Sequence, residues 1–369
     1  MPFHAEPMFP GDLFDTTARV AADAPASPGF SGMQPSATWD QFLELGWQAV
    51  LIAEAHGGAG ASLGDVAAIA EAAGRHALPA PLVARCAVVP TLLAGIAGQA
   101  SAAALLNDIA MGKASVCPVL DLPAGALAAR GQGSQGDRVV LDGTLRGIDL
   151  SEPATHLLFV APLDGAPALF LAPRAALSGS VRDYLGIDGR QTTDIALNAL
   201  ELPAASVLLR GDGVQQLVDH AQAVGALLCC AQMIGAIGAM IEQTIDYLGM
   251  RQQFGVALAT FQALRHKVVE MYVAYENARG MVRQQLVALD GAAAGTLSAA
   301  TLRDVALVKF YLSVTGRTAA ESAIQLHGGI GMSRELPAAR LAMHTLACSQ
   351  QWGDRFTLLD RLAAEPALH

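Results

Sequence analysis

Two glycine-containing segments in the last third of the chain carry side chains suited to a phosphorylated cofactor. The first, residues 251–255, reads Arg-Gln-Gln-Phe-Gly, and Gln262 follows it closely. The guanidinium of Arg251 presents a fork of donors that matches the oxygens of a diphosphate. The competing interpretation is that Arg251 only meets the carbonyl end of the helix before it. Spacing alone does not separate the two.

The second segment, residues 325–332, reads Gln-Leu-His-Gly-Gly-Ile-Gly-Met, with Glu335 and Pro337 behind it. Glycines let a flat or charged ligand approach the main chain closely. An ordinary glycine helix end is the competing interpretation. His266 and His327 flank the candidate site, and neither is assigned chemistry, because a lone histidine is more often structural.

A third segment lies near the N-terminus, where Gly46-Trp47 is followed by Glu54-Ala55-His56-Gly57-Gly58-Ala59-Gly60. Together the three segments resemble the acyl-CoA dehydrogenase family, which has Pro-Glu before Gly-Gly-x-Gly, then Arg-x-x-Phe-Gly, then Gln-x-x-Gly-Gly-x-Gly. Ala53 stands where the family has proline. Each motif alone is only suggestive, whereas three in order across the chain make a specific match.

The resemblance implies a FAD-dependent α,β-dehydrogenation of an acyl-CoA thioester. A carboxylate removes the α proton and the flavin accepts the β hydrogen as hydride. In this family the matched segments reach across a subunit interface to FAD that the neighbouring subunit mainly holds. The residues so implied are Arg251, Gln253, Phe254, Gln262, Gln325, Gly328 and Gly329. No metal site is expected, since no Cys/His ligand pattern is present.

The catalytic base of the family is missing. Most members place a Glu-Gly pair soon after the third motif, and that position reads Trp352-Gly353 here. Other members use a glutamate on the first C-terminal helix, at a position that falls on Gly225-Ala226. Neither an indole nor a glycine accepts a proton. Asp354 is a weak candidate for a relocated base, and its simpler interpretation is a solvated acid beside Arg355.

The middle of the chain also departs from the family. The flavin-facing Thr-Glu-Pro-x-x-Gly-Ser segment is replaced by residues 115–121, Ser-Val-Cys-Pro-Val-Leu-Asp, then Leu-Pro-Ala-Gly. The family's Trp-Ile-Thr/Ser strand is replaced by residues 144–149, Thr-Leu-Arg-Gly-Ile-Asp. The parts that would hold this chain's own flavin ring are eroded, and those that serve a neighbour's FAD are retained.

We therefore expect one subunit of a heteromeric acyl-CoA dehydrogenase, in a heterotetramer with a homologous catalytic subunit that carries the base and the acyl-CoA. Such heteromers resemble enzymes of steroid side-chain degradation, and an electron-transfer flavoprotein is the implied acceptor. The alternatives are a self-sufficient enzyme that uses Asp354, a scaffold subunit without turnover, and a flavoprotein of different chemistry.

Three compositional zones predict an α+β fold of the family type. Residues 1–115 read as an N-terminal helical domain, 116–212 as a small middle β-barrel domain, and 213–369 as a C-terminal four-helix bundle. Helices are expected over 214–249, 260–289, 297–325 and 337–363, another between Ser62 and Gly74, and an amphipathic one around Trp39. Strands are expected at 138–143, entering a turn at Asp142-Gly143, and at 156–161 and 168–172.

The composition narrows the partners and the compartment. A net charge of −10 disfavours nucleic acid and anionic lipid. The apolar stretch 218–241 is interrupted by polar residues and predicts a buried helix rather than a membrane span. Gly235 and Gly238 within it predict close helix packing. The five cysteines are irregularly spaced and predict reduced structural thiols, and the N-terminus lacks a signal pattern, so we expect a cytoplasmic protein.

Overall fold

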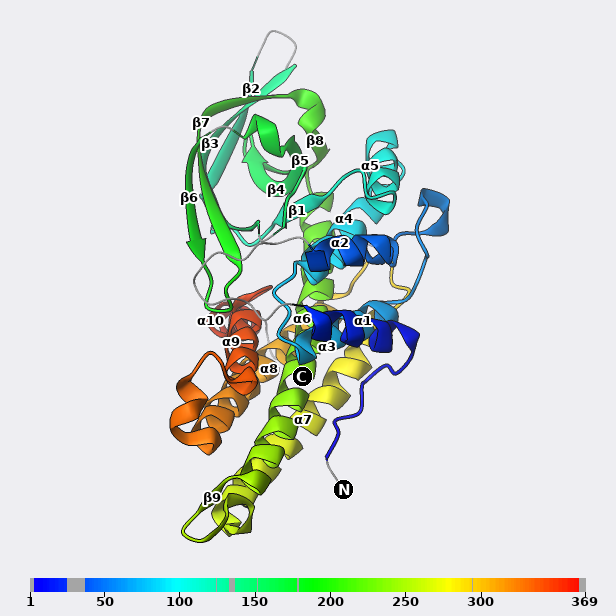
Figure 1. The fold of residues 1–369 in the computed structure, drawn as a ribbon. Helices are drawn as coiled ribbons and strands as arrows, with labels where there is room; N and C mark the ends of the chain where they lie inside the picture. Colours follow the sequence, from blue (N-terminus) through cyan, green and yellow to red (C-terminus); the bar gives the residue numbers. More distant parts are fainter. Residues whose placement is uncertain are drawn as a thin grey trace.

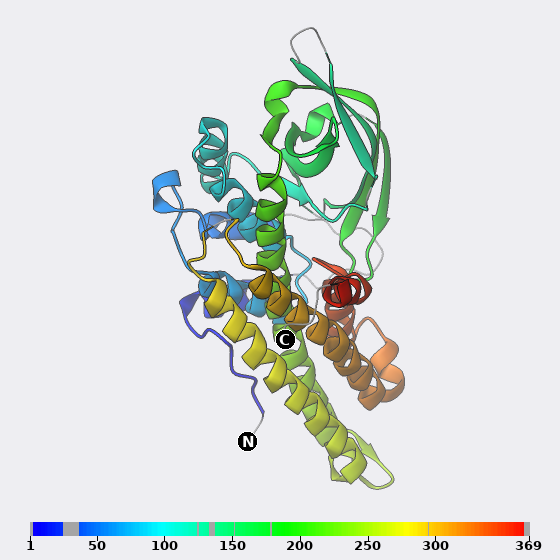
Figure 2. The ribbon, with the colours of Figure 1, turned by 180° about the vertical axis from the view of Figure 1, so that it is seen from behind.

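The chain begins with helices, continues as a sheet and returns to long helices, in a computed structural model (Figure 1). The structure describes residues 3–24, 37–123, 125–132, 137–150, 152–177, 179–293 and 295–364. Seen from behind, the sheet forms one end of the molecule and the long helices extend away from it (Figure 2). The change from helix to strand falls between Ala110 and Val116, and the change back falls between Arg210 and Gly213.

The N-terminal helices are short, and the chain encodes their starts locally. They are α1 (Asp12–Asp23), α2 (Ala37–Glu44), α3 (Leu63–Arg75), α4 (Val89–Ala94) and α5 (Ala100–Ala110). The expected helix at Ser62 is confirmed, since the Ser62 hydroxyl accepts from the Asp65 N–H and the Asp65 carboxylate accepts from the Ser62 N–H. A π-helical turn, Ala84–Val88, leads into α4.

The middle segment forms one eight-stranded sheet within the described residues. Its strands are β1 (Val116–Val119), β2 (Leu127–Gln132), β3 (Arg138–Asp149), β4 (His156–Leu163), β5 (Ala166–Pro173), β6 (Ser180–Leu185), β7 (Gln191–Pro203) and β8 (Val207–Arg210). The order is β6-β7-β3-β2-β4-β5-β8, with β1 parallel to β4. The curved sheet encloses a hydrophobic core of its own, which contains the stacked rings of Phe159 and Phe170.

The turn expected at Asp142-Gly143 is wrong, because β3 continues through it to Asp149. Gly143 has a φ of +127°, and the β3–β7 register shifts between Leu141 and Gly143. A Cβ on Gly143 would lie 2.1 Å from the carbonyl oxygen of Ala126. The glycine therefore makes a bulge where β2 approaches closely, rather than a hairpin.

The C-terminal part contains α6 (Gly213–Met250), a hairpin of β9 (Gln252–Gln253) and β10 (Val256–Ala257), α7 (Gln262–Leu289), α8 (Ala299–His327), α9 (Pro337–Gln350) and α10 (Arg355–Ala364). The helix expected over 337–363 is wrong, because it divides into α9 and α10. Trp352 and Gly353 adopt φ values of +56° and +101°, which an α-helix excludes.

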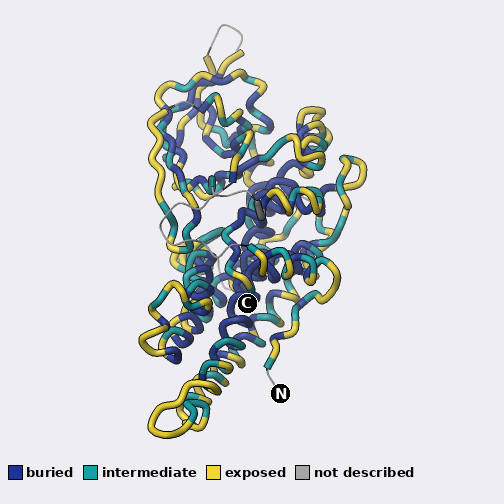
Figure 3. Tube along the Cα trace, viewed as in Figure 1, coloured by how far each residue is buried: buried dark blue, intermediate teal, exposed yellow. Residues whose placement is uncertain are grey.

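Helix α6 runs through the centre of the molecule, buried along most of its length (Figure 3). It is the one helix of the described residues with the length and hydropathy of a membrane span, and that apolar window is wholly buried. The interpretation of residues 218–241 as a core helix is thus confirmed. Helices α3, α7, α8 and α9 all pack against it.

Two glycines permit the crossing of α3 and α6. A Cβ on Gly235 of α6 would lie 2.0 Å from the Glu71 carbonyl oxygen, and a Cβ on Gly74 of α3 would lie 2.0 Å from the Gln232 carbonyl oxygen. Both obstacles are helix backbone, which cannot rotate away. The two helices therefore touch main chain to main chain, as Gly235 predicted.

We expect Gly235→Ala to lower the free energy of unfolding by about 1–3 kcal/mol, because the methyl group forces the two helices apart. Gly280→Ala on α7 is the matched control, since nothing lies within 4 Å of its added Cβ. That control should stabilise by up to ~1 kcal/mol through helix propensity. Urea denaturation of both variants measures the difference. Equal effects would show that the α3–α6 contact is looser than described.

The N-terminal segment is fastened to the helices by buried polar side chains. The Met8 N–H donates to the Glu71 carboxylate at 2.8 Å, and the Ala5 N–H donates to Glu242 at 2.6 Å. Arg75 pairs with Glu242 at 2.8 Å. Burial raises the pKa of Glu71 to about 7, against the opposing Met8 hydrogen bond and the charge of Arg279.

A raised carboxylate pKa means that the folded state holds the Glu71 proton more tightly than the unfolded chain does. This stabilisation is complete below the ordinary glutamate pKa and is lost as pH rises through about 7. We expect the free energy of unfolding to fall by about 1 kcal/mol between pH 6 and 8 from this group. Glu71→Gln keeps an acceptor for Met8 and should remove that part of the slope. An unchanged slope in denaturation curves would contradict the assignment.

Candidate functional site

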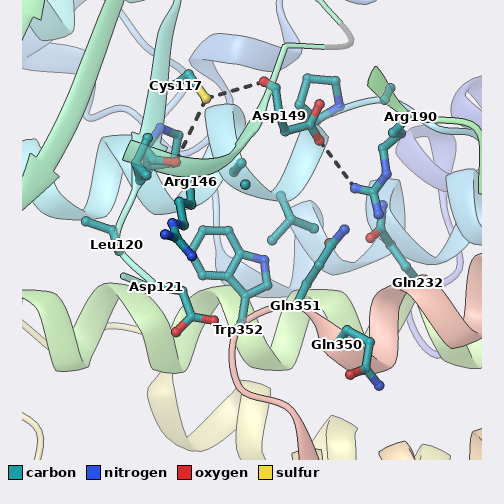
Figure 4. Close-up of a pocket in the computed structure, with 17 residues that line it drawn as sticks. Cys117, Leu120, Asp121, Arg146, Asp149, Arg190, Gln232, Gln350, Gln351 and Trp352 are labelled. Atoms are coloured by element: carbon teal, nitrogen blue, oxygen red, sulfur yellow. Dashed lines mark hydrogen bonds and ion pairs between the residues drawn. The ribbon is translucent and has the colours of Figure 1, made fainter. Parts of the chain in front are cut away.

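A cavity of about 240 Å³ lies where the sheet meets the helices (Figure 4). Residues 80–84 and the β1 segment 117–121 form one side, and Arg146 lies on β3. Gln232 of α6 and the loop 350–352 close the other side. Small-molecule and cofactor sites usually enclose about 300–1,000 Å³, so this cavity is smaller than a typical one.

The two positions at which members of the family carry the base are in contact here, and Trp352 lines the cavity. The indole of Trp352 packs on Gly225, where an added Cβ would lie 2.8 Å from Trp352 Cδ2 and 3.0 Å from Val88 Cγ2. The glycine at 225 is therefore required by the indole at 352. Trp352 is a non-glycine residue in the left-handed region, a strained conformation that clusters at functional sites.

The charged groups of the cavity are mostly paired with one another. Arg190 is buried and lies 2.6 Å from Asp188 and 3.4 Å from Asp149. In the amide orientation that satisfies both partners, the Gln351 oxygen also accepts from Arg190. The net effect is a wall with little uncompensated charge on the Arg190 side.

Asp121 is a carboxylate at this cavity that sequence reasoning did not single out. It lies beside Trp352 and below Arg146 in Figure 4. Burial, followed by the charge of Asp354, raises its pKa. A titratable group with a raised pKa in a cavity is a marker of functional sites. Its only signal in the sequence was its place in the segment where the family pattern is lost.

Asp354 caps a helix instead of entering the cavity. Its carboxylate accepts from the Phe356 N–H at 2.8 Å, the Thr357 N–H at 3.3 Å and the Thr357 hydroxyl at 2.6 Å. The Thr357 hydrogen bond is the main cause of its lowered pKa. These are the contacts of an N-cap on α10, so the carboxylate pairs with main chain rather than with Arg355.

The seven residues that resemblance assigned to FAD lie at the other end of the bundle. All are exposed: Arg251, Gln253, Phe254, Gln262, Gln325, Gly328 and Gly329. The β9–β10 hairpin marks this end in Figure 1, far from the sheet. Tyr247 of α6 stacks on the buried His327 of α8, with ring centroids 4.6 Å apart, and so joins the two motif segments. His266 is exposed on α7.

Most of the functional groups at this end make no side-chain hydrogen bond or ion pair within the described part of the chain, and Gln253 donates only to the neighbouring Gln252 carbonyl. The Arg251 guanidinium makes no hydrogen bond or ion pair there, which argues against a role on its own helix carbonyls. Gly328 needs its φ of +65° and ψ of −145°, whereas Gly329 has ordinary φ and open space at its Cβ. Folding does not require glycine at 329, but close approach of another molecule would.

Exposed apolar side chains surround these groups. Phe254 is 90% exposed and holds a left-handed φ of +55° at the hairpin tip. Met332 is 78% exposed and Met250 is 77% exposed, with Ile330 beside them on the glycine segment. A polar group framed by exposed hydrophobic residues is typical of a surface that another molecule covers.

Comparison with known proteins agrees with this architecture. Residues 211–355 match the family model for the acyl-CoA dehydrogenase C-terminal domain. A relative in Mycobacterium tuberculosis, acyl-CoA dehydrogenase IpdE2, is 26% identical over 292 residues, or 79% of this chain and 74% of the relative. The Tcur3481-Tcur3483 steroid acyl-CoA dehydrogenase, a G363A variant, shares 25% identity, 95% of both chains and a TM-score of 0.80.

A chain of the ChsE4-ChsE5 complex from Mycobacterium tuberculosis has the same fold, with a TM-score of 0.80 at 20% identity over 98% of this chain and 100% of that one. The fold is thus α+β, with N-terminal helices, a central sheet domain and a C-terminal helical domain. Residues 211–355 thus match the acyl-CoA dehydrogenase C-terminal domain family, and the chain as a whole is similar to acyl-CoA dehydrogenases in sequence and fold.

We expect Asp354→Ala to destabilise the protein by about 0.5–2 kcal/mol at pH 7 through loss of the α10 cap. Because the folded pKa is lowered, the contribution of the charged cap is present above the ordinary aspartate pKa and is lost as pH falls through the folded value. Thermal unfolding of both proteins at pH 7 and below pH 4 measures this. A difference that grows on acidification would contradict the cap.

Proposed function

We propose that this chain is the non-catalytic subunit of a hetero-oligomeric, FAD-dependent acyl-CoA dehydrogenase. A homologous partner carries the base and the acyl-CoA. This chain contributes Arg251, Gln262, Gln325 and the glycines of 328–329 to the FAD that the partner holds. A heterotetramer is the expected assembly.

The observation that carries the proposal is the contact between Trp352 and Gly225. Both places from which family members bring a carboxylate are occupied by an indole and the glycine beneath it. Proton abstraction needs an acceptor placed at the substrate's α carbon, and these groups offer none. The replacement is a packed pair, so restoring a carboxylate at either position alone would leave a clash or a void.

The exposed end of the bundle fits a phosphorylated cofactor held by a neighbour. Arg251 offers two parallel donors to a diphosphate, Gln325 offers an amide, and Gly328–Gly329 leave the main chain open to close approach. When bound, FAD supplies the hydride acceptor of the reaction. This chain's residues would bind and orient its phosphate-bearing part and would exclude water from it.

The chain's own cavity does not fit the same group. Its volume of about 240 Å³ is too small for a dinucleotide, and Trp352 occupies its middle. Along α6 the rise from Gly225 to Arg251 is about 40 Å. The cavity and the exposed surface therefore cannot serve one catalytic centre within a single chain, which supports a partner.

The names of similar proteins suggest a substrate and an electron acceptor for the proposed complex. The Tcur3481-Tcur3483 protein is named a steroid acyl-CoA dehydrogenase. We infer a steroid-derived acyl-CoA thioester at the partner's site, an electron-transfer flavoprotein as acceptor, and action in the cytoplasm.

A self-sufficient enzyme is the second candidate. The raised pKa of Asp121 makes this residue a better candidate for the base of such an enzyme than Asp354. Asp354 is engaged as a cap. The two proposals differ in flavin content, since a self-sufficient enzyme binds FAD without a partner. A scaffold subunit would leave Arg251 without a role.

We expect the chain purified alone to be free of FAD, and the co-expressed complex to hold one FAD per pair of unlike chains. Arg251→Ala should lower the flavin content or raise the FAD dissociation constant by about tenfold or more, because a charge-assisted diphosphate contact is lost. Trp352→Phe is the matched control and should leave kcat of the complex within about twofold, since the cavity takes no part in turnover.

Flavin absorbance, native mass and steady-state kinetics measure these outcomes. A yellow homo-oligomer that is bleached by an acyl-CoA would overturn the proposal, and Asp121→Asn would then test the second candidate. A complex whose flavin content ignores Arg251 would support a scaffold instead.

A further inference from the structure

Two of the five cysteines meet a buried lysine at the centre of the bundle. All five thiols are free and buried. Cys229 Sγ of α6 lies 3.2 Å from the carbonyl oxygen of Cys348 on α9, and the two thiols influence each other's pKa. The Lys309 ammonium of α8 lies 3.7 Å from Cys229 Sγ and 2.6 Å from the Cys348 carbonyl oxygen. Three helices therefore bring two sulfurs and one cation together.

Lys309 has no exposed surface, so its charge needs a partner inside the protein. No carboxylate accepts a hydrogen bond from it within the described residues. Its contacts are one carbonyl oxygen and the Cys229 sulfur. A thiolate on Cys229 is the anion that the geometry offers to balance the ammonium.

The neighbouring thiols show that this environment is specific to Cys229. The Cys348 hydrogen bond and the positive charge of Lys309 lower the pKa of Cys229 to about 6, although burial opposes them. Burial raises the pKa of Cys230, the adjacent residue, to about 12, and it does the same for Cys86 and Cys117. The charge of Lys309 also lowers the pKa of Cys230 without overcoming burial there, so the contact with Cys348 distinguishes Cys229 from its neighbour.

We propose that Cys229 and Cys348 form a redox-active pair that hydrogen peroxide converts to a disulfide, with Lys309 as the positioning group that holds Cys229 as a thiolate. The position of Cys229 against both the Cys348 main chain and the buried Lys309 ammonium carries this assignment. It does not rest on the proposed dehydrogenase function.

Hydrogen peroxide is the only oxidant that this reaction needs. The Cys229 thiolate attacks one peroxide oxygen, the O–O bond breaks, and a sulfenic acid and hydroxide form. The Cys348 sulfur then attacks the Cys229 sulfur, the S–O bond breaks and the S–S bond forms. The proton of the Cys348 thiol and the proton that Cys229 released to solvent when it ionised complete two water molecules, so two thiols and one peroxide give one disulfide and two waters.

The pair adjoins the cavity, which is the route that we propose for peroxide. Cys348 Sγ lies 3.7 Å from Gln232 Oε1, and Gln232 lines the cavity wall. One amide layer therefore separates the sulfur from a space large enough for a water-sized molecule. A reactive thiol must be reachable by its oxidant, and peroxide is small enough to pass a side-chain fluctuation where a larger disulfide reagent is not.

Oxidation of the pair is expected to change the structure of the cavity wall. Lys309 donates to the Cys348 carbonyl near the end of α9, and Trp352 follows four residues later. Forming the disulfide removes the thiolate that balances Lys309 and leaves a buried cation unpaired. The loop that carries Trp352 should therefore move when the pair is oxidised.

Each element that packs against the Cys229–Cys348 pair brings titratable or charged groups close to it. Those on α6, α8, α9 and the β6–β7 turn are Cys230, Lys309, His344, Asp188 and Arg190. His344 Nε2 lies 3.5 Å from Cys348 Sγ, and burial lowers the pKa of His344 to about 4. His344 is thus neutral near pH 7, and Arg190 adds a second positive charge that favours the thiolate.

The test uses the full chain, reduced, desalted and then exposed to hydrogen peroxide. Samples are denatured in N-ethylmaleimide and analysed by intact and peptide mass spectrometry. We expect a loss of two hydrogens, three labelled thiols and a linked peptide pair containing Cys229 and Cys348. Cys230→Ser should leave the rate unchanged, and Lys309→Met should slow it by about tenfold or more.

Five labelled thiols after peroxide, or a linkage involving Cys86, Cys117 or Cys230, would overturn the proposal. If Lys309→Met does not fold, the pH profile of the unsubstituted protein decides. A thiolate formed near pH 6 gives a rate that is level between pH 7 and 8. A rate that rises about tenfold over that interval would mean an ordinary buried thiol, and the proposal would fail.

Discussion

The burial of α6 is the constraint on which the other features depend. This helix of 38 residues passes through the whole molecule, and nearly every neighbouring helix packs against it. Gly235 lets α3 approach it main chain to main chain. The same helix places Gly225 against Trp352, Cys229 in the core and Arg251 at the far surface. Any change in its position would move all three sites together.

Three positively charged residues lie near different points of α6, and each is balanced in a different way. At the cavity, Arg190 is neutralised by Asp188 and Asp149. In the core, Lys309 lacks a carboxylate and faces sulfur instead. At the far end, Arg251 is exposed and unpaired within the described chain. Arg190 is thus balanced within the chain. In our proposals the balance of Lys309 depends on the redox state of Cys229, and Arg251 is balanced by another molecule.

In the proposed function, catalysis and cofactor binding are physically separable because the two groups of residues lie at opposite ends of one helix. The indole of Trp352 packs on Gly225 and lines the cavity. It leaves the bundle end untouched, about 40 Å along the axis. A subunit can therefore lose its own turnover and still complete a cofactor site on a partner, which a compact single-site enzyme could not do.

The sequence by itself determined the α–β–α order and the buried helix 218–241, and its motifs carried the resemblance to acyl-CoA dehydrogenases, because periodicity and motif spacing can be read along the chain. It could not reveal that Trp352 meets Gly225, that Asp354 caps α10, or that Asp121 lines the cavity, since these contacts join distant segments. The turn misplaced at Gly143 and the helix broken at Trp352 have the same origin. Close approach of other strands and side chains, decided only by tertiary packing, overrode local propensity there.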